Sequence, residues 1–525
     1  MVSLYCMLKK FQKSTRHLFL VLILFAEQLG VIAMLLGRKK IYTDEREIDE
    51  SNVVDVVMKA YRQHKQISNE IQFLLDYELG LQTIPRPKVI RPEINIEAID
   101  NLASQITTFN TGYSWGSPAM IVQRSDLESP ESDAERDGKA IAKLNSIMVN
   151  NVHIGCEDQK LARFVEITGI GHRFIDIKSR LDNTGLPFEY ATLDSRYAFC
   201  VYYGGIGERK MLGVTFSRRK NVLSLTAYTD THRYDIERGQ LISSEINPLG
   251  RIPIVETERA IDRTGCFERL ISQLDALNTK VSDLSDAIAQ STQEIWWGND
   301  IKFPVDEQGK PIAPKSGQWV LTFTGGDGNN PNIKPLSTTL DQEATQKTIQ
   351  AERIHILELA KVPIQYSSEG GGSTGIAMDI SSGWSSAEVD AMRKQQLVER
   401  AKREELDLIL TAIAQAPASV VPASDVLRSV RAIDCDFHFN RRKNYDMAVK
   451  ANTFATYVSH GLHGRHALKE IDAFGDVEQV WEDSKPLIEA YQKATFLNAA
   501  SEQTDDRIMQ DNSDQIENSP ALQNV

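Results

Sequence analysis

The chain has 525 residues, of which 41% are hydrophobic and 25% are charged, and its formal net charge is −13. This composition is typical of a folded protein, and from the length we expect two to four domains or subregions. The acidic balance argues against a surface that binds nucleic acid by neutralising phosphates, although it suits a surface past which a polyanion slides. Five scattered cysteines without CxxC spacing indicate a reducing compartment, with neither a disulfide framework nor a zinc site.

Residues 1–33 form an apolar extension with basic flanks. Its run HLFLVLILFAEQLGVIAMLLG is interrupted by Glu27, and a carboxylate near the middle of a bilayer costs about 2.5 kcal/mol or more. The basic start fits a signal peptide, but no A-x-A-like cleavage site follows the apolar run. We expect that translation begins at Met34 and that the extension is a start-site artefact, with a membrane anchor as the alternative.

Residues 34–260 are predicted to be helical at first and then β-rich. Apolar residues recur at intervals of three and four from Ile48 to Gln82, which predicts a helix, and a second helix is expected at about 95–110. Runs rich in β-branched and aromatic residues, with turn residues between them, fill residues 186–256. This pattern is typical of an antiparallel sheet or a small barrel.

The most regular pattern of the chain lies within residues 261–292 and predicts a long amphipathic helix. Apolar residues occupy one face of this helix, and the other face carries Asp275, Lys280, Asp283 and Asp286.

The remaining segments alternate helices with other structure. We expect a compact module rich in Gly and Pro, a second helix, a glycine-rich loop, a third and charged helix, a region of helices with one strand-like run, and an acidic disordered tail. In chain order these segments are 293–338, 339–366, 367–385, 386–416, 417–496 and 497–525.

The glycine-rich loop does not carry a nucleotide-binding motif. A Walker loop requires Lys and then Ser or Thr directly after its last glycine, whereas Gly375 is followed by Ile376 and Ala377. The chain has no G-x-G-x-x-G after a predicted strand, and its ten histidines lack the context of a hydrolase, zincin or Cys/His site. We therefore expect no catalytic residue, no metal site and no cofactor. The loop is either a flexible connector or a segment that must change shape against a neighbour.

Six blocks resemble the portal proteins of tailed bacteriophages, of the type found in long-tailed phages of Gram-positive hosts. In chain order they are GRKKIYTDEREIDESNVVDVVMKAYRQH, FLLDYELGLQTIPRPKVIRPEIN, TGYSWGSPAMIV, INPLGRIPIVETE, GGGSTGIAM and FHFNRRKNYDMAV. Six blocks in the family's order, spread over nearly the whole chain, make a chance match improbable.

This resemblance implies an α+β, predominantly helical portal fold with wing, stem, clip and crown regions, assembling into a dodecameric ring around a channel. It makes 34–260 and the helix at 386–416 parts of the wing, and 261–292 and 339–366 the stem. By the same resemblance the clip is 293–338, the tunnel loop is 367–385 and the crown is 417–496.

Two candidate sites follow from the resemblance. The tunnel loop would line the narrowest part of the channel with Gly370, Gly371, Gly372, Ser373, Thr374, Gly375, Met378 and Asp379. Because residues 367–391 contain no Lys or Arg, a ring of such loops repels phosphate. In the clip, Trp296, Trp297 and Trp319 are candidates for partner binding, or they form the small core of an independently folded insert.

The resemblance also implies the partners: other copies of the chain, double-stranded DNA in the channel, the terminase large subunit, a head-completion or adaptor protein, and the major capsid and scaffold proteins. It places the protein at the capsid vertex of the virion after assembly in the host cytoplasm, with no membrane partner and no catalytic activity, since ATP hydrolysis belongs to the terminase. A membrane-anchored oligomeric scaffold and a nucleotide-dependent enzyme are the alternatives.

Overall fold

The computed structural model describes residues 37–84, 93–124, 131–220, 222–291, 296–299, 306–308, 332–335, 342–364, 383–439, 447–471, 480–481 and 483–487. The chain forms two compact units, each discontinuous in sequence: unit 1 comprises Met1–Gly116 and Val152–Arg428, and unit 2 comprises Ser117–Asn151 and Ser429–Val525. Residues 117–151, which the sequence analysis placed with the N-terminal region, therefore group with C-terminal residues.

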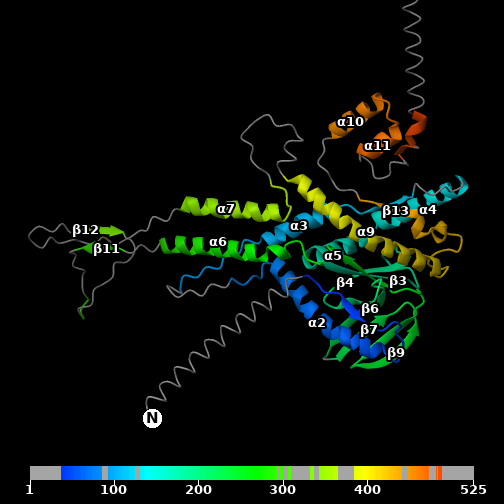
Figure 1. Cartoon of the computed structure of the whole chain (residues 1–525), viewed down its shortest axis with the longest axis horizontal. Coiled ribbons are helices and arrows are strands. Elements are labelled where there is room, and N and C mark those ends of the chain that lie inside the picture. The colour runs from blue at the N-terminus through cyan, green and yellow to red at the C-terminus, as the bar shows by residue number, and fades with distance from the viewer. Residues whose placement is uncertain are drawn as a thin grey trace, which may run out of the picture. The chain divides into compact units, whose positions relative to one another are not determined.

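A six-stranded sheet forms one part of unit 1 (Figure 1). Its strand order is β1 (Ile41–Thr43), β5 (Ala198–Tyr203), β6 (Lys210–Arg219), β7 (Val222–Tyr228), β8 (His232–Glu237) and β9 (Gln240–Ile246). Strands β5 to β9 are antiparallel neighbours, which confirms the antiparallel strands expected at 186–256. The short parallel strand β1 was not predicted, because three residues are too few to show an alternating pattern.

A second sheet of unit 1 has three antiparallel strands in the order β10 (Ile254–Glu258), β3 (Ile170–Ile177) and β4 (Phe188–Leu193). Two helices pack against it, α5 (Val152–Thr168) and α9 (Trp384–Gln415). All five residues of β10 are buried, as expected for a strand that is covered by other elements.

Helix α2 (Val53–Glu78) links the six-stranded sheet to the long helices that follow it in the sequence. Its buried residues share one hydrophobic core with strands β5 to β8 and with helices α3 (Leu102–Trp115), α6 (Ile271–Ser291) and α7 (Gln342–Leu359). The predicted helix in 48–82 is thus confirmed, and it ends before Gly80, whose φ of 88° favours glycine.

The prediction of a helix at 95–110 is wrong about where the helix begins. Residues 93–101 are not helical, and helix α3 begins at Leu102. The side chain of Asn101 accepts a hydrogen bond from Ser104 N at 3.4 Å and so caps the helix.

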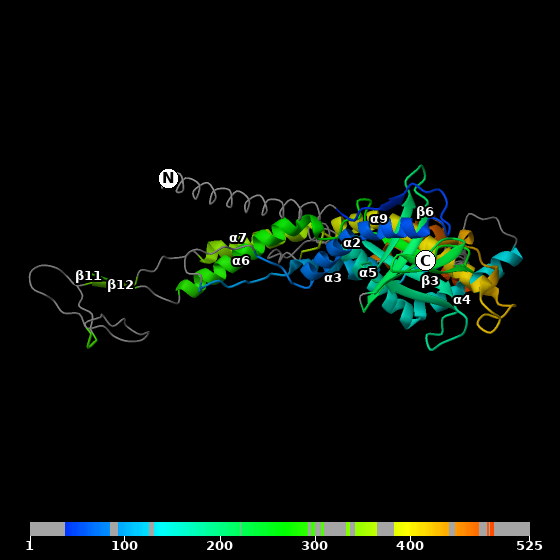
Figure 2. The ribbon, with the colours of Figure 1, turned by 90° about the horizontal axis from the view of Figure 1, so that it is seen from below.

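Helices α6 and α7 lie side by side in opposite directions, and a short 3-10 helix, η1 (Glu268–Leu270), precedes α6 (Figures 1 and 2). Between them in the sequence, β11 (Trp296–Asn299) pairs antiparallel with β12 (Asn332–Pro335). The three long helices expected from 261 onward are therefore present as α6, α7 and α9.

Unit 2 contains a two-stranded antiparallel sheet, in which β2 (Met120–Gln123) pairs with β13 (Cys435–His438). Helix α4 (Glu131–Asn150) packs against β2, and the Asn145 side chain accepts a hydrogen bond from Ile121 N at 2.9 Å. Helices α10 (Met447–Ser459) and α11 (Gly464–Ile471) contact one another, and a short 3-10 helix lies at Ala432–Asp434. Another short 3-10 helix, Val426–Ser429, begins in unit 1 and ends at the first residue of this C-terminal segment. The strand-like run expected in 417–496 is confirmed by β13.

Among the helices in the described ranges, none is long and apolar enough to cross a membrane. The apolar extension at 1–33 lies outside those ranges.

Candidate functional site

The pair formed by α6 and α7 is held together by an apolar seam and two flanking ion pairs. Leu274 and Leu277 of α6 and Ile349 and Ile356 of α7 are buried in the common core. On one flank Lys280 of α6 contacts Glu352 of α7. On the other flank Arg353 Nε lies 3.0 Å from Asp100 Oδ2, in the extended segment before α3. We call these the Lys280 flank and the Asp100 flank.

The extended segment 93–101, here called the strap, is bonded along α6 by polar side chains. Ile96 N donates to Asp286 Oδ1 at 2.8 Å, Ala98 N to Ser282 Oγ at 3.0 Å, and Asp100 N to Asn278 Oδ1 at 2.8 Å. Two residues of extended chain advance about 6.6 Å, and four residues of helix about 6 Å. The two repeats match, so every second strap amide meets the next helical turn.

The three helix residues that hold the strap were missed or misplaced by the sequence analysis. Asp286 was expected on the exposed face, but only 3% of it is exposed, and Asn278 and Ser282 are fully buried. Asp275 is half-buried and accepts a hydrogen bond from the Tyr77 hydroxyl at 2.7 Å. The signal in the sequence was a polar stripe at intervals of four beside the apolar face.

The start of α6 is fixed by a buried carboxylate, that of Glu268. One oxygen accepts from Gly37 N at 3.1 Å and contacts the buried guanidinium of Arg38, and the other accepts from Gly265 N at 2.8 Å. Burial raises the pKa of Glu268, and the positive charge of Arg38 opposes that rise. A Cβ at Gly265 would lie 2.0 Å from the carbonyl oxygen of Ile167, so only glycine fits this crossing.

Helix α9 is attached near its start by a buried charge cluster around Glu166 of α5. Lys394 Nζ lies 3.3 Å and Arg259 Nε 2.8 Å from the Glu166 carboxylate, and the Trp115 indole donates to it at 3.2 Å. Burial acts to raise the pKa of Glu166, but the charges of Lys394 and Arg259 and the donated hydrogen bonds outweigh it and lower this pKa to about 2. The carboxylate is therefore ionised throughout the neutral range.

A second cluster holds α9 further along. Lys402 Nζ lies 3.2 Å from Asp158 Oδ1 and 2.9 Å from Glu405 Oε2, and the buried Arg173 contacts Asp158 and packs over the Tyr190 ring. Burial acts to raise the pKa of Asp158, but Lys402 and Arg173 lower it below its ordinary value. Charged residues thus make up part of the face that α9 presents to the three-stranded sheet.

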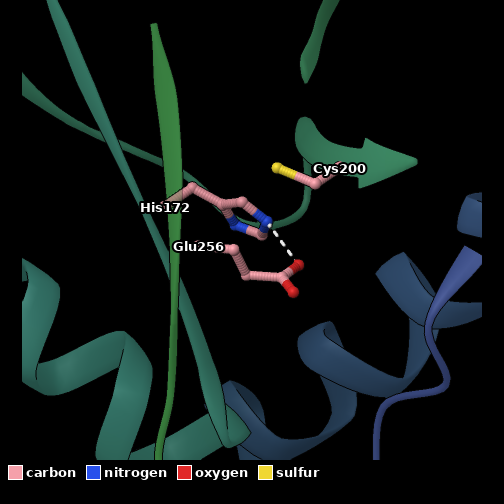
Figure 3. A group of neighbouring side chains, drawn as sticks. All are labelled: His172, Cys200 and Glu256. Carbon is pink, nitrogen blue, oxygen red and sulfur yellow. Dashed lines mark hydrogen bonds and ion pairs between the residues drawn. The ribbon is translucent and has the colours of Figure 1, made fainter. Parts of the chain in front are cut away.

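A third buried group, formed by His172, Cys200 and Glu256, has ligand atoms within 4.8 Å of one another (Figure 3). Its atoms are already paired: His172 Nε2 lies 3.1 Å from Glu256 Oε2, Ser195 Oγ lies 3.0 Å from His172 Nδ1, and Arg263 lies 2.7 Å from the same Glu256 oxygen. Burial raises the pKa of the Cys200 thiol and keeps it protonated. Because the Glu256 carboxylate already contacts His172 and the Arg263 guanidinium, the group suits an internal ion-pair network better than a metal site.

Comparison with known proteins identifies the family. The sequence model described as phage portal protein, SPP1 Gp6-like, matches residues 90–463, well over half of the chain. The chain belongs to this family. The recognition of the chain as a phage portal protein is confirmed, although the first block, 37–64, and most of the second, 73–95, precede the matched residues. The protein is a bacteriophage portal protein of the capsid vertex that serves DNA packaging. A comparison of the chain with curated proteins found no match.

The two candidate sites of this portal protein lie mainly outside the described residues. That holds for all eight tunnel-loop residues from Gly370 to Asp379 and for Trp319. Trp296 and Trp297 lie in β11, where their backbones pair with Pro335 and Lys334 of β12, and their side chains are not described.

The structure does describe both ends of the segment that holds the predicted tunnel loop. Helix α7 ends at Leu359, residues 360–364 follow it, and α9 begins at Trp384 after Gly383. A Cβ placed on Gly383 would lie 3.8 Å from the Cα of Pro363, so the two ends are neighbours. The described residues on either side of 365–382 therefore lie close together.

Proposed function

We propose that this portal protein assembles into a closed ring, a dodecamer by its family resemblance, around a channel that conducts double-stranded DNA during packaging and ejection. The observation that carries the proposal is the braced pair of α6 and α7, fixed at its base by Glu268 and along its length by the strap. In this proposal 261–292 and 339–366 are the stem and 293–338 the clip. The wing is 34–260 with 386–416, and the crown is 417–496.

The tunnel loop is proposed at 367–385 because of what holds its two ends. One end follows α7, whose apolar seam and ion pairs fix it to α6. The other end precedes α9, which the Glu166 cluster fixes to helix α5. Rotational symmetry brings one such loop from each copy to the axis, and glycines allow each loop to change shape as the duplex passes.

The partners are proposed by region. The clip, with Trp296, Trp297 and Trp319 as candidate anchors, docks the terminase large subunit during packaging and a head-completion or adaptor protein afterwards. The major capsid and scaffold proteins contact the outer regions during assembly in the host cytoplasm. ATP hydrolysis belongs to the terminase. The origin in a long-tailed phage of a Gram-positive host stays a prediction.

The loop mechanism is tested by stiffening the loop in the phage that encodes this chain. Gly371→Pro with Gly372→Pro restricts the backbone at two neighbouring positions. We expect rings of normal appearance but few DNA-filled heads, measured by electron microscopy of lysates and by nuclease-protected DNA. Gly371→Ala with Gly372→Ala is the matched control, because alanine leaves more backbone freedom. Full packaging by the double proline variant would refute the mechanism.

A further inference from the structure

Two exposed apolar surfaces lie on the two flanks of the α6 and α7 pair. The first surface, here called the strap face, joins the end of α2 to the strap and consists of Leu79, Leu81, Glu93, Glu97 and Ile99, the last three of which share one side of the extended chain. Asn101 joins the end of the strap to the end of α2, because Asn101 Nδ2 donates to Glu78 O at 2.8 Å and Gln82 Nε2 donates to Asn101 Oδ1 at 3.2 Å. Leu81 is 70% exposed, so much of its apolar surface is left in water.

The second surface, here called the corner face, lies where α7 ends and α9 begins. It consists of Leu359, Lys361, Val389, Met392 and Arg393. Residues 389, 392 and 393 share the outer side of α9 because they are three and four positions apart. Val389 is 67% exposed, and the approach of Gly383 to Pro363 places this helix start beside the end of α7.

The two surfaces belong to opposite flanks. The strap runs on the Asp100 flank, where Arg353 reaches Asp100. Leu359 follows Glu352 by seven residues, or about two helical turns, so it lies on the Lys280 flank. The strap and Leu359 of the corner face therefore lie on different flanks of the α6 and α7 pair.

The charges on the two surfaces are opposite. Glu93 and Glu97 of the strap face are exposed, and neither has an ion-pair partner among the described residues. Lys361 and Arg393 of the corner face are likewise exposed without an ion-pair partner in the described ranges. An acidic apolar surface and a basic apolar surface on different flanks of this pair complement each other in a head-to-tail contact.

We propose that the strap face of one copy packs against the corner face of the next copy. The inference rests on the proposed ring and names the surfaces that close it. Because the two surfaces differ, the contact is heterologous, and a fixed rotation between neighbours closes it into a ring. Burial of the exposed Leu, Ile, Val and Met side chains supplies the affinity, and the acid and base pairs set the register.

Charge reversal in the full chain tests the contact. In Glu97→Arg and in Arg393→Glu, like charges would face each other across the interface, and we expect the concentration at which rings form to rise by about tenfold, equivalent to about 1.4 kcal/mol. The double variant Glu97→Arg with Arg393→Glu restores an opposite-charge pair, and we expect assembly within about threefold of the wild type. Mass photometry over a concentration series measures all three.

The matched control is Glu237→Arg, which reverses the charge of an exposed residue at the end of β8, outside both surfaces. We expect it to assemble like the wild type. Unchanged assembly of both single variants, or a double variant as impaired as the singles, would overturn the proposed contact and leave the ring intact. A wild-type chain that forms no rings would instead overturn the proposed function itself, so the two failures are distinguishable.

Discussion

Ser282→Ala removes the central contact between α6 and the strap while changing one atom. Ser282 Oγ accepts from Ala98 N at 3.0 Å and donates to Ala98 O at 3.2 Å, and the serine is fully buried. Its loss leaves two backbone groups unpaired, at a cost of about 1–3 kcal/mol. Because about 1.4 kcal/mol corresponds to a factor of ten, we expect the amide of Ala98 to exchange roughly tenfold faster or more.

Hydrogen exchange with mass spectrometry on peptides covering 93–101 measures this effect. The matched control is Ser285→Ala, about one turn further along α6, whose hydroxyl donates to Val281 O of its own helix at 2.9 Å and forms no hydrogen bond with a described residue of the strap. We expect the control to leave the strap amides unchanged. If Ser282→Ala exchanged at the wild-type rate in this segment, the side-chain ladder would not be what holds the strap.

Two further predictions concern buried titratable groups. The pKa of Glu166 lies near 2, below its ordinary 4.5, so its ionised form contributes stability that is complete above pH 4.5 and is lost as the pH falls to about 2. This contribution is on the order of 3 kcal/mol of unfolding free energy. Urea unfolding across this pH range measures it, and Glu166→Gln should flatten the dependence of the unfolding free energy on pH. An unchanged slope in the variant would contradict the prediction. Burial lowers the pKa of His64 from 6.5 to about 4, so stability falls as the pH drops through that interval. His64→Gln should remove this fall, and a variant with the wild-type profile would refute the assignment.

The long helices and the antiparallel strands were predictable because their patterns are local. The apolar stripe of α6 and the alternating apolar residues of β5 to β8 indicate which side of each element is buried. This pattern is the same whichever element packs against that side. The three polar residues that bind the strap carry no such signal by themselves. Asn278 and Ser282 are polar residues inside an amphipathic helix, and their partners lie 178 and 184 positions away.

The buried charges were not predictable for a related reason. Lys394 and Lys402 occur in a helix rich in charge, where sequence patterns favour a solvated face. Their burial depends on Glu166 and Asp158, which a different helix supplies from more than 200 positions away. The glycine-rich loop differs from these charged residues. Its interpretation as a tunnel loop came from its place in the order of family blocks and did not depend on a contact with any other residue.

The ring is the central claim, and electron microscopy of the purified full chain tests it most directly. We predict particles with a central hole and a single high rotational symmetry, with α6 and α7 beside the channel. Single chains or open assemblies without rotational symmetry, both alone and in the presence of the scaffold protein of the same phage, would contradict the account.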